Sequence, residues 1–166
     1  MSCQRICVLG LGGGGFHFSI ERLVSQMPAD FQLILVYVIH TQARGNWHSP
    51  SRPHRAFVVR SPTLFHDSWP RRVRSFVAAC WRAAGILLAT RPDCVLAVGT
   101  AQAVPFALVA RLVGVPVVFV ESVTRVAGPS RTGRLLSALG LPTIHYVQWP
   151  RLASSRRVRF TGSVIA

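Results

Sequence analysis

Short apolar runs alternate with helix-like segments along most of the chain, and glycine or proline turns separate them. The runs that predict strands are Ile6–Leu9, Gln32–Ile39, Ala56–Val59, Cys94–Val98, Val117–Val120 and Ile144–Val147. Gln32–Ile39 is apolar almost throughout, which is typical of a strand covered on both faces. Strands that alternate with helices form βαβ units around a parallel sheet. We therefore predict an α/β fold, a Rossmann-like parallel sheet with helices on both faces.

Helical spacing of apolar residues predicts the elements between these strands. The predicted helices run from Phe16 to Val24, from Pro70 to about Thr90, over Ala101–Val113, and through a short segment that ends at Ser137. The second has an apolar stripe made of Val73, Phe76, Val77, Cys80, Trp81, Ala84, Leu87 and Leu88. Such a stripe is usually core, but a basic amphipathic helix can also lie on an anionic membrane. Both interpretations stay open here, with core favoured.

Length and cysteine usage indicate a single domain over residues 1–166 with reduced thiols. The four cysteines show no C-x-x-C spacing, so neither a zinc site nor another metal site is expected. Met1–Gly10 has no apolar signal region. The two most apolar stretches carry Arg82 and Arg111 in their middles, so we expect no transmembrane helix. The segment from Thr41 to Pro53 is polar and is predicted to be a long surface loop.

The chain is strongly basic. It has 19 basic residues, all of them arginine, against 5 acidic ones, and its formal net charge is +14 at pH 7. The planar, permanently charged guanidinium matches phosphate, so we expect an anionic membrane surface or a phosphorylated substrate as partner. A GC-rich genome would also explain the absence of lysine. The sequence offers no base-reading helix and no aromatic RNA-binding strand pair, so no nucleic acid partner is expected.

Three loops are predicted to meet at the carboxyl edge of the sheet, where such sheets bind ligands: Gly10–Phe16, Gly99–Gln102 and Glu121–Pro129. In the first, Gly12, Gly13, Gly14 and Gly15 precede a helix whose N-terminus attracts anions. This favours a phosphate or diphosphate site, although a tight turn without a ligand has the same pattern. The next strand ends Tyr37-Val38-Ile39-His40 without a carboxylate, so we expect no dinucleotide cofactor and predict none of another kind.

Polar side chains in these loops are the candidate site residues. His17 and Glu121 are the candidate catalytic bases, with a surface histidine and a salt bridge to Arg125 as the alternatives. Phosphate binding is predicted for a basic, hydroxyl-rich segment: Arg125, Ser130, Arg131 and Thr132. The remaining pocket residues are Gly99, Thr100, Gln102 and Ser122.

Several short motifs follow one another between Arg91 and Pro150. They are Arg91-Pro92-Asp93, Gly99-Thr100, Glu121-Ser122-x-x-Arg125-Val126, Thr132-Gly133-Arg134 and Val147-Gln148-Trp149-Pro150. This segment resembles the membrane-associated subunit of the two-part UDP-GlcNAc transferase of N-glycan lipid precursor synthesis. It also resembles that subunit's bacterial relatives in exopolysaccharide and capsule biosynthesis. In that family the glycines are followed directly by histidine, whereas here Phe16 precedes His17.

The resemblance implies the N-terminal Rossmann-like half of a GT-B glycosyltransferase that is split between two chains. This half would bind a polyprenyl-diphosphate-linked saccharide, and a catalytic partner chain would bind the UDP-sugar. The acceptor's diphosphate would lie at Gly12–Gly15. We therefore expect a subunit held peripherally, in the bacterial manner, on the cytoplasmic face of the plasma membrane. The alternative is a non-catalytic scaffold that recruits the partner chain to the membrane.

Overall fold

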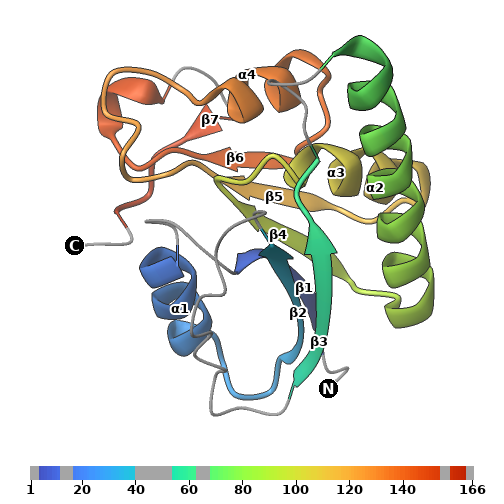
Figure 1. Cartoon of the computed structure of the whole chain (residues 1–166). Helices are drawn as coiled ribbons and strands as arrows, with labels where there is room; N and C mark the ends of the chain where they lie inside the picture. The colour runs from blue at the N-terminus through green and yellow to red at the C-terminus, as the bar shows by residue number, and fades with distance from the viewer. Residues whose placement is uncertain (1–3, 12–16, 40–53, 63–67, 154–157, 164–166) are drawn as a thin grey trace.

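The computed structural model describes residues 4–11, 17–39, 54–62, 68–153 and 158–163. In this part of the chain a seven-stranded parallel sheet has the order β3-β2-β1-β4-β5-β6-β7 (Figure 1). The strands are β1 (Arg5–Leu11), β2 (Gln32–Ile39), β3 (His54–Arg60), β4 (Cys94–Val98), β5 (Val117–Val120), β6 (Ile144–Tyr146) and β7 (Val158–Arg159). The order reverses between β1 and β4, which is where sheets of this type bind ligands at their carboxyl edge.

Helices cover both faces of the sheet (Figure 1). They are α1 (His17–Gln26), α2 (Trp69–Thr90), α3 (Ala103–Leu112) and α4 (Arg131–Ala138), followed by a short 3₁₀ helix, η1 (Pro150–Leu152). Successive residues of a strand point to opposite faces. In β1, Val8 packs with Ile20 of α1 in one core cluster, whereas Cys7 and Leu9 belong to a second cluster with residues of α2 and α3. The predicted Rossmann-like α/β fold is confirmed.

Some element boundaries differ from those predicted. The third strand begins at His54 rather than Ala56, and the third helix begins at Ala103 rather than Ala101 because residues 101–102 form a turn. The last predicted strand ends at Tyr146 rather than Val147. The sequence analysis missed β7, a strand of 2 residues whose pairing with β6 depends on tertiary contact rather than on a local pattern. The predicted loop Thr41–Pro53 lies outside the described residues.

The apolar stripe of α2 is only partly core. Of its residues Leu87 is buried, whereas Trp81 is 82% exposed and Val77 is 59% exposed. The buried side of the helix also includes Ala79 and Ala83, which the predicted stripe did not contain. The expectation that the whole stripe is core is therefore wrong, because α2 contacts α3 and β3 along one side only. By length and composition alone, α2 is also the one described helix long and apolar enough to cross a membrane.

The described cysteines Cys7, Cys80 and Cys94 are free thiols. Burial raises the pKa of the Cys7 thiol to about 12, and the neighbouring Cys94 adds to this effect. Burial likewise raises the thiol pKa of Cys80 and Cys94. These thiols have the character of inert core side chains, since the reactive species is the thiolate.

Candidate functional site

The end of β1 lies very close to the end of β4. Gly10 has a φ of +113°, and a Cβ built on it would lie 2.8 Å from the carbonyl oxygen of Val98 and 2.9 Å from Cδ1 of Ile20. Only glycine fits this position without a shift of β4 or α1. The end of β1 at Gly10 therefore lies next to the start of the Gly99–Gln102 loop.

The Gly99–Gln102 loop connects β4 to α3 at this edge. Gly99 adopts a left-handed φ of +53°, and its N–H donates to the Val120 carbonyl oxygen at 3.1 Å. Oγ1 of Thr100 accepts a hydrogen bond from the Gln102 N–H at 3.3 Å. The Gln102 side chain is fully buried, and neither of its amide atoms has a hydrogen-bond partner among the described residues. Of the predicted pocket residues here, Thr100 and Gln102 are thus part of the interior.

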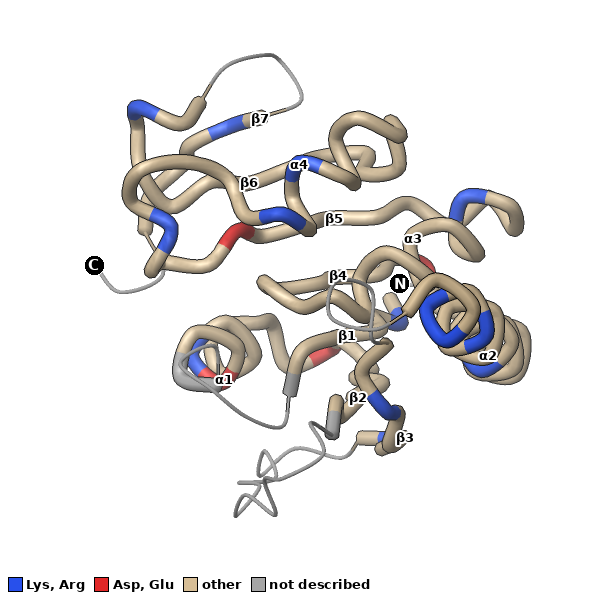
Figure 2. Tube along the Cα trace, turned by 45° about the horizontal axis from the view of Figure 1, so that its top comes forward, with Lys and Arg blue, Asp and Glu red and all other residues tan. Residues whose placement is uncertain are grey.

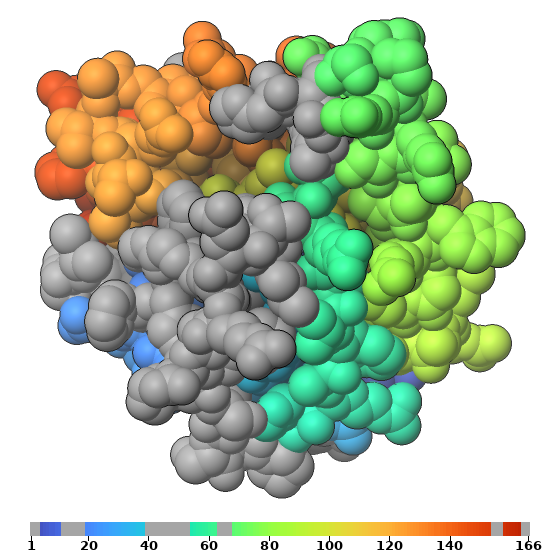
Figure 3. Space-filling model, in the orientation of Figure 1, coloured from blue at the N-terminus to red at the C-terminus, as the bar shows by residue number. Residues whose placement is uncertain are grey.

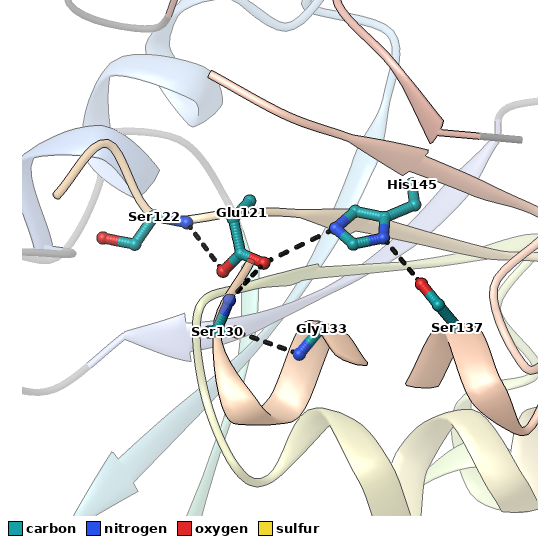
Figure 4. A network of polar contacts seen from close by, with 6 residues as sticks. All are labelled: Glu121, Ser122, Ser130, Gly133, Ser137 and His145. Carbon is teal, nitrogen blue, oxygen red and sulfur yellow. Dashed lines mark hydrogen bonds and ion pairs between the residues drawn. The ribbon is translucent and has the colours of Figure 1, made fainter. Parts of the chain in front are cut away.

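Glu121 directly follows β5 and is the centre of a buried polar network (Figure 4). Its Oε2 accepts a hydrogen bond from the Ser130 N–H at 3.0 Å, and its Oε1 accepts one from the Ser122 N–H at 3.3 Å. Nε2 of His145 lies 3.6 Å from Oε2, an ion-pair distance. On its other side, Nδ1 of His145 lies 3.0 Å from Oγ of Ser137. The network therefore connects β5, β6 and both ends of α4.

The network also defines the start of α4. Oγ of Ser130 caps this helix by accepting the Gly133 N–H at 2.9 Å. The Glu121 carboxylate lies at the same helix N-terminus, where the helix dipole favours negative charge. A Cβ on Gly133 would overlap Oε2 of Glu121 and would lie 3.2 Å from both Cε1 of His145 and Oγ of Ser130. The carboxylate therefore occupies the space that a side chain at 133 would need.

The environment of Glu121 stabilises its charged form. Burial acts to raise the pKa of the carboxyl, but the His145 ring and the hydrogen bonds from Ser130 outweigh burial and hold this pKa below its ordinary value. The side chain of Glu121 is fully enclosed. A base must reach a substrate proton, and an enclosed carboxylate with a lowered pKa is poorly placed for that role.

Side chains of the segment that follows β6 form hydrogen bonds with the loop between Glu121 and α4. Nε1 of Trp149 donates to the Val123 carbonyl oxygen at 2.9 Å, and the guanidinium of Arg151 donates to the Val126 carbonyl oxygen. Inside the loop, the hydroxyls of Ser122 and Thr124 lie 2.8 Å apart. Arg125 is exposed on this fastened loop. Its guanidinium is thus presented to solvent from a fixed backbone.

The structure separates the predicted site residues into three groups. Gly12–Gly15 lie outside the described residues, and so does the side chain of His17, whose backbone begins α1. Arg125 and Arg131 are exposed at the carboxyl edge. The interior group comprises half-buried Gly99 and the buried residues Thr100, Gln102, Glu121, Ser122, Ser130 and Thr132. The observed partner of Glu121 is His145, in place of the Arg125 salt bridge considered as an alternative.

The sequence analysis missed His145, Ser137 and Gly133. His145 is the one polar residue of the strand Ile144-His145-Tyr146, and it pairs with Phe119 in the β5–β6 ladder. The two rings meet edge to face, with centroids 5.0 Å apart. His145 is the buried residue of this strand, between half-buried Ile144 and Tyr146. A histidine inside a short apolar run was the available signal, because a buried imidazole needs a polar partner.

Comparisons with known proteins agree with this architecture. Residues 6–164 match the family described as "Oligosaccharide biosynthesis protein Alg14 like". The human protein "UDP-N-acetylglucosamine transferase subunit ALG14" is 34% identical over 92 residues, which are 52% of this chain and 42% of the human protein. The chain thus spans less than half the length of this relative.

Solved structures give the same fold at low sequence identity. MurG of Acinetobacter baumannii has a TM-score of 0.68 and 17% identity, covering 95% of this chain and 45% of MurG. The complex of S. aureus MnaA with UDP has a TM-score of 0.66 and 16% identity, covering 97% of this chain and 44% of MnaA. These likenesses show a Rossmann-like domain of the GT-B type. Together with the family match over nearly the whole chain, they confirm the resemblance found in the sequence: the chain belongs to the Alg14-like family of oligosaccharide biosynthesis proteins.

Proposed function

We propose that this chain is the acceptor-binding, membrane-associated subunit of a two-chain glycosyltransferase. The observation that carries the proposal is its membership of the Alg14-like family, whose human member is named as a subunit of a UDP-N-acetylglucosamine transferase. A separate catalytic chain binds the UDP-sugar. This chain binds a polyprenyl-diphosphate-linked saccharide, with the diphosphate at Gly12–Gly15 and with Arg125 and Arg131 balancing its charge.

The reaction needs one base and no cofactor in this proposal. A hydroxyl oxygen of the acceptor sugar forms a bond to the anomeric carbon of the donor, and the bond from that carbon to UDP breaks with inversion. The hydroxyl proton goes to a base, and UDP leaves with the bonding electrons. Because Glu121 is enclosed and engaged, we assign the base to His17 and give Glu121 the positioning of α4 and of the loop before it.

A non-catalytic scaffold that only recruits the partner to the membrane is the second candidate. It is favoured by the burial of Glu121, Ser130 and Thr132, whose observed contacts are structural. The two candidates differ in what happens when membrane recruitment is made unnecessary. A scaffold is dispensable with a short-chain acceptor in detergent, whereas an acceptor-binding subunit is still required.

The test uses the tagged chain co-expressed with its neighbouring reading frames and purified from membranes. The partner alone, this chain alone and the complex are assayed with UDP-sugars, including UDP-GlcNAc, and a short-chain polyprenyl-diphosphate saccharide in detergent. We expect transfer only from the complex. Full activity of the partner alone would establish the scaffold, and transfer by this chain alone would contradict both proposals.

Membrane association is proposed to occur through α2, which lies along the cytoplasmic face of the plasma membrane. The exposed apolar residues of α2 recur at helical spacing on one side: Trp69, Val73, Val77, Trp81 and Leu88. Exposed Arg71, Arg74 and Arg82 belong to the same helix. Figure 2 shows basic residues along α2, and Figure 3 shows that this helix (green) forms one side of the molecular surface. Apolar side chains flanked by arginine fit an anionic bilayer surface.

Replacing Trp81 by serine should weaken binding to phosphatidylglycerol vesicles about tenfold, because roughly 1.4 kcal/mol or more of apolar burial is lost. Stability should change little, since the side chain is 82% exposed. Leu112→Ser is the matched control, because Leu112 is 78% exposed but lies on α3. Vesicle co-sedimentation measures both. Equal losses of vesicle binding for the two variants would contradict the proposal that α2 is the membrane-binding surface.

A further inference from the structure

A cavity of about 590 Å³ opens at the edge of the sheet opposite the candidate site. Its lining comes from the first residues of β1, β2 and β3 and from the last turn of α2. Arg5 and Gly10 lie near opposite ends of β1, roughly 17 Å apart at the rise of an extended strand. The cavity is therefore separate from Gly10, at the end of β1, and from Glu121.

The charged lining of this cavity is basic. Among the described residues, Arg5, His54, Arg55 and Arg91 line it together with the neutral polar residues Gln32 and Thr90, and no described aspartate or glutamate does. The three arginines come from segments far apart in the sequence, and Figure 2 shows basic positions on β3, on α2 and beside the N-terminus. The fold thus brings three arginines to the lining of one cavity, and their positive charges raise the electrostatic potential there.

The three arginines differ in their contacts with the rest of the protein. Arg5 has a structural role, because it lies 3.8 Å from an Asp93 carboxylate oxygen and donates to the Thr90 carbonyl oxygen at 3.4 Å. Its positive charge there complements the C-terminus of α2. Arg55 and Arg91 are exposed and form no ion pair with any described residue. Within the described part of the chain, no carboxylate neutralises either of these two charges.

The backbone at Arg91 adds a separate observation. Arg91 caps α2 in the left-handed conformation, with φ 44° and ψ 61°, and its N–H donates to the Leu87 carbonyl oxygen at 2.8 Å. Glycine is the residue that this position favours, because other residues are strained there. Arg91 nevertheless occupies this strained position, and it is one of the residues that line the cavity.

We propose that this cavity binds a phosphate-bearing anion. Guanidinium groups bind phosphate oxygens in pairs, and the volume lies within the roughly 300–1,000 Å³ of small-molecule sites. The anion is either a free phosphorylated molecule or the headgroup of an anionic phospholipid, since α2 borders the cavity. None of the lining residues belongs to the proposed transfer site, so this inference stands apart from the proposed function.

The first test maps arginine accessibility in the full chain. Phenylglyoxal modification is followed by peptide mass spectrometry with and without inorganic pyrophosphate. We expect pyrophosphate to slow the modification of Arg55 and Arg91 at least fivefold and to leave Arg111 unchanged. Arg111 is exposed at the end of α3 and does not line the cavity. Equal protection of all three, or protection of none, would overturn the proposal.

The second test uses the double variant Arg55→Ala/Arg91→Gly. Glycine at 91 suits the left-handed backbone, so the fold should be retained. We expect at least a tenfold loss of pyrophosphate affinity at this site by titration calorimetry, with sugar transfer by the complex unchanged. Arg111→Ala, which changes the net charge in the same direction, should stay within twofold of the parent chain. Similar losses for the Arg111 variant would show a general charge effect and refute the site.

Vesicle binding identifies the source of the phosphate. If the ligand is a lipid headgroup, the double variant loses binding to phosphatidic acid vesicles, and pyrophosphate competes with those vesicles for the parent chain. If it is a free molecule, vesicle binding is unchanged while pyrophosphate affinity falls. Both outcomes support the site and differ only in what fills it.

Discussion

Replacing Gly133 by alanine is expected to destabilise the domain by about 3 kcal/mol or more. The new methyl group would overlap Oε2 of Glu121 and press on Oγ of Ser130 and on the His145 ring. The carboxylate cannot move aside cheaply, because it is enclosed and accepts the N–H groups of Ser122 and Ser130. Displacing it would leave buried donors unpaired and would loosen the N-terminus of α4. Urea unfolding measures the loss.

Gly85→Ala is the matched control for this prediction. Gly85 lies inside α2, is exposed, and has no atom within 4 Å of a Cβ built on it. The same substitution there should stabilise the domain by about 0.5–1 kcal/mol, because alanine is the better helix former. The two glycines should thus give opposite signs. Two stabilising results, or two destabilising ones of similar size, would show that Gly133 has no special relation to Glu121.

Glu121→Gln is expected to lower the free energy of unfolding by about 3 kcal/mol at pH 7. It should also make the stability of the domain fall less steeply as the pH is lowered. The carboxylate accepts backbone N–H groups at both oxygens, whereas an amide offers only one acceptor and turns an NH₂ group toward the other donor. The variant is nearly isosteric, so the cost reports on charge and hydrogen bonding rather than on a cavity. Urea midpoints at pH 7 measure it.

The pH dependence has a definite sign. The folded-state pKa of Glu121 is lowered, so its contribution to stability is fully present above the unfolded pKa. That contribution is lost as the pH falls through the folded-state pKa. The gap in unfolding free energy between the parent chain and Glu121→Gln should therefore narrow from pH 7 towards pH 3. A gap that stays constant over this range would mean that the carboxylate is not held in its charged form.

The sequence predicted the parallel sheet well because most of its strands contain an apolar run and its turns carry glycine or proline. It also predicted that Glu121 lies at the carboxyl edge, since a residue that directly follows a strand lies at the carboxyl end of that strand. The role of Glu121 was harder to predict. The backbone N–H of Ser130 becomes its partner only because the loop folds back on the end of β5, and His145 arrives from the neighbouring strand.

The stripe on α2 shows a different limit of sequence patterns. The spacing of Val77, Trp81 and Leu87 predicts a helix with an apolar side. It does not predict how much of that side the rest of the domain covers. Only the side that includes Ala83 and Leu87 meets the sheet and α3, while Trp81 faces solvent. An apolar side without a partner inside the chain is an indication of an external surface, and it becomes visible only when the helix is packed.

The strand order also divides the sheet of the described residues into two sets of strands that share one ladder, while both core clusters contain residues from each set. Strands β1 to β3 pair among themselves, as do β4 to β7, and within the described residues the β1–β4 ladder is the one seam between them. A cut in the chain between β3 and α2 therefore leaves every other ladder intact in its own fragment. Reassembly needs the seam and the packing of α2 against β3. The domain is thus suited to fragment complementation. In such an assay, two separately expressed halves recover the folded structure only when they associate.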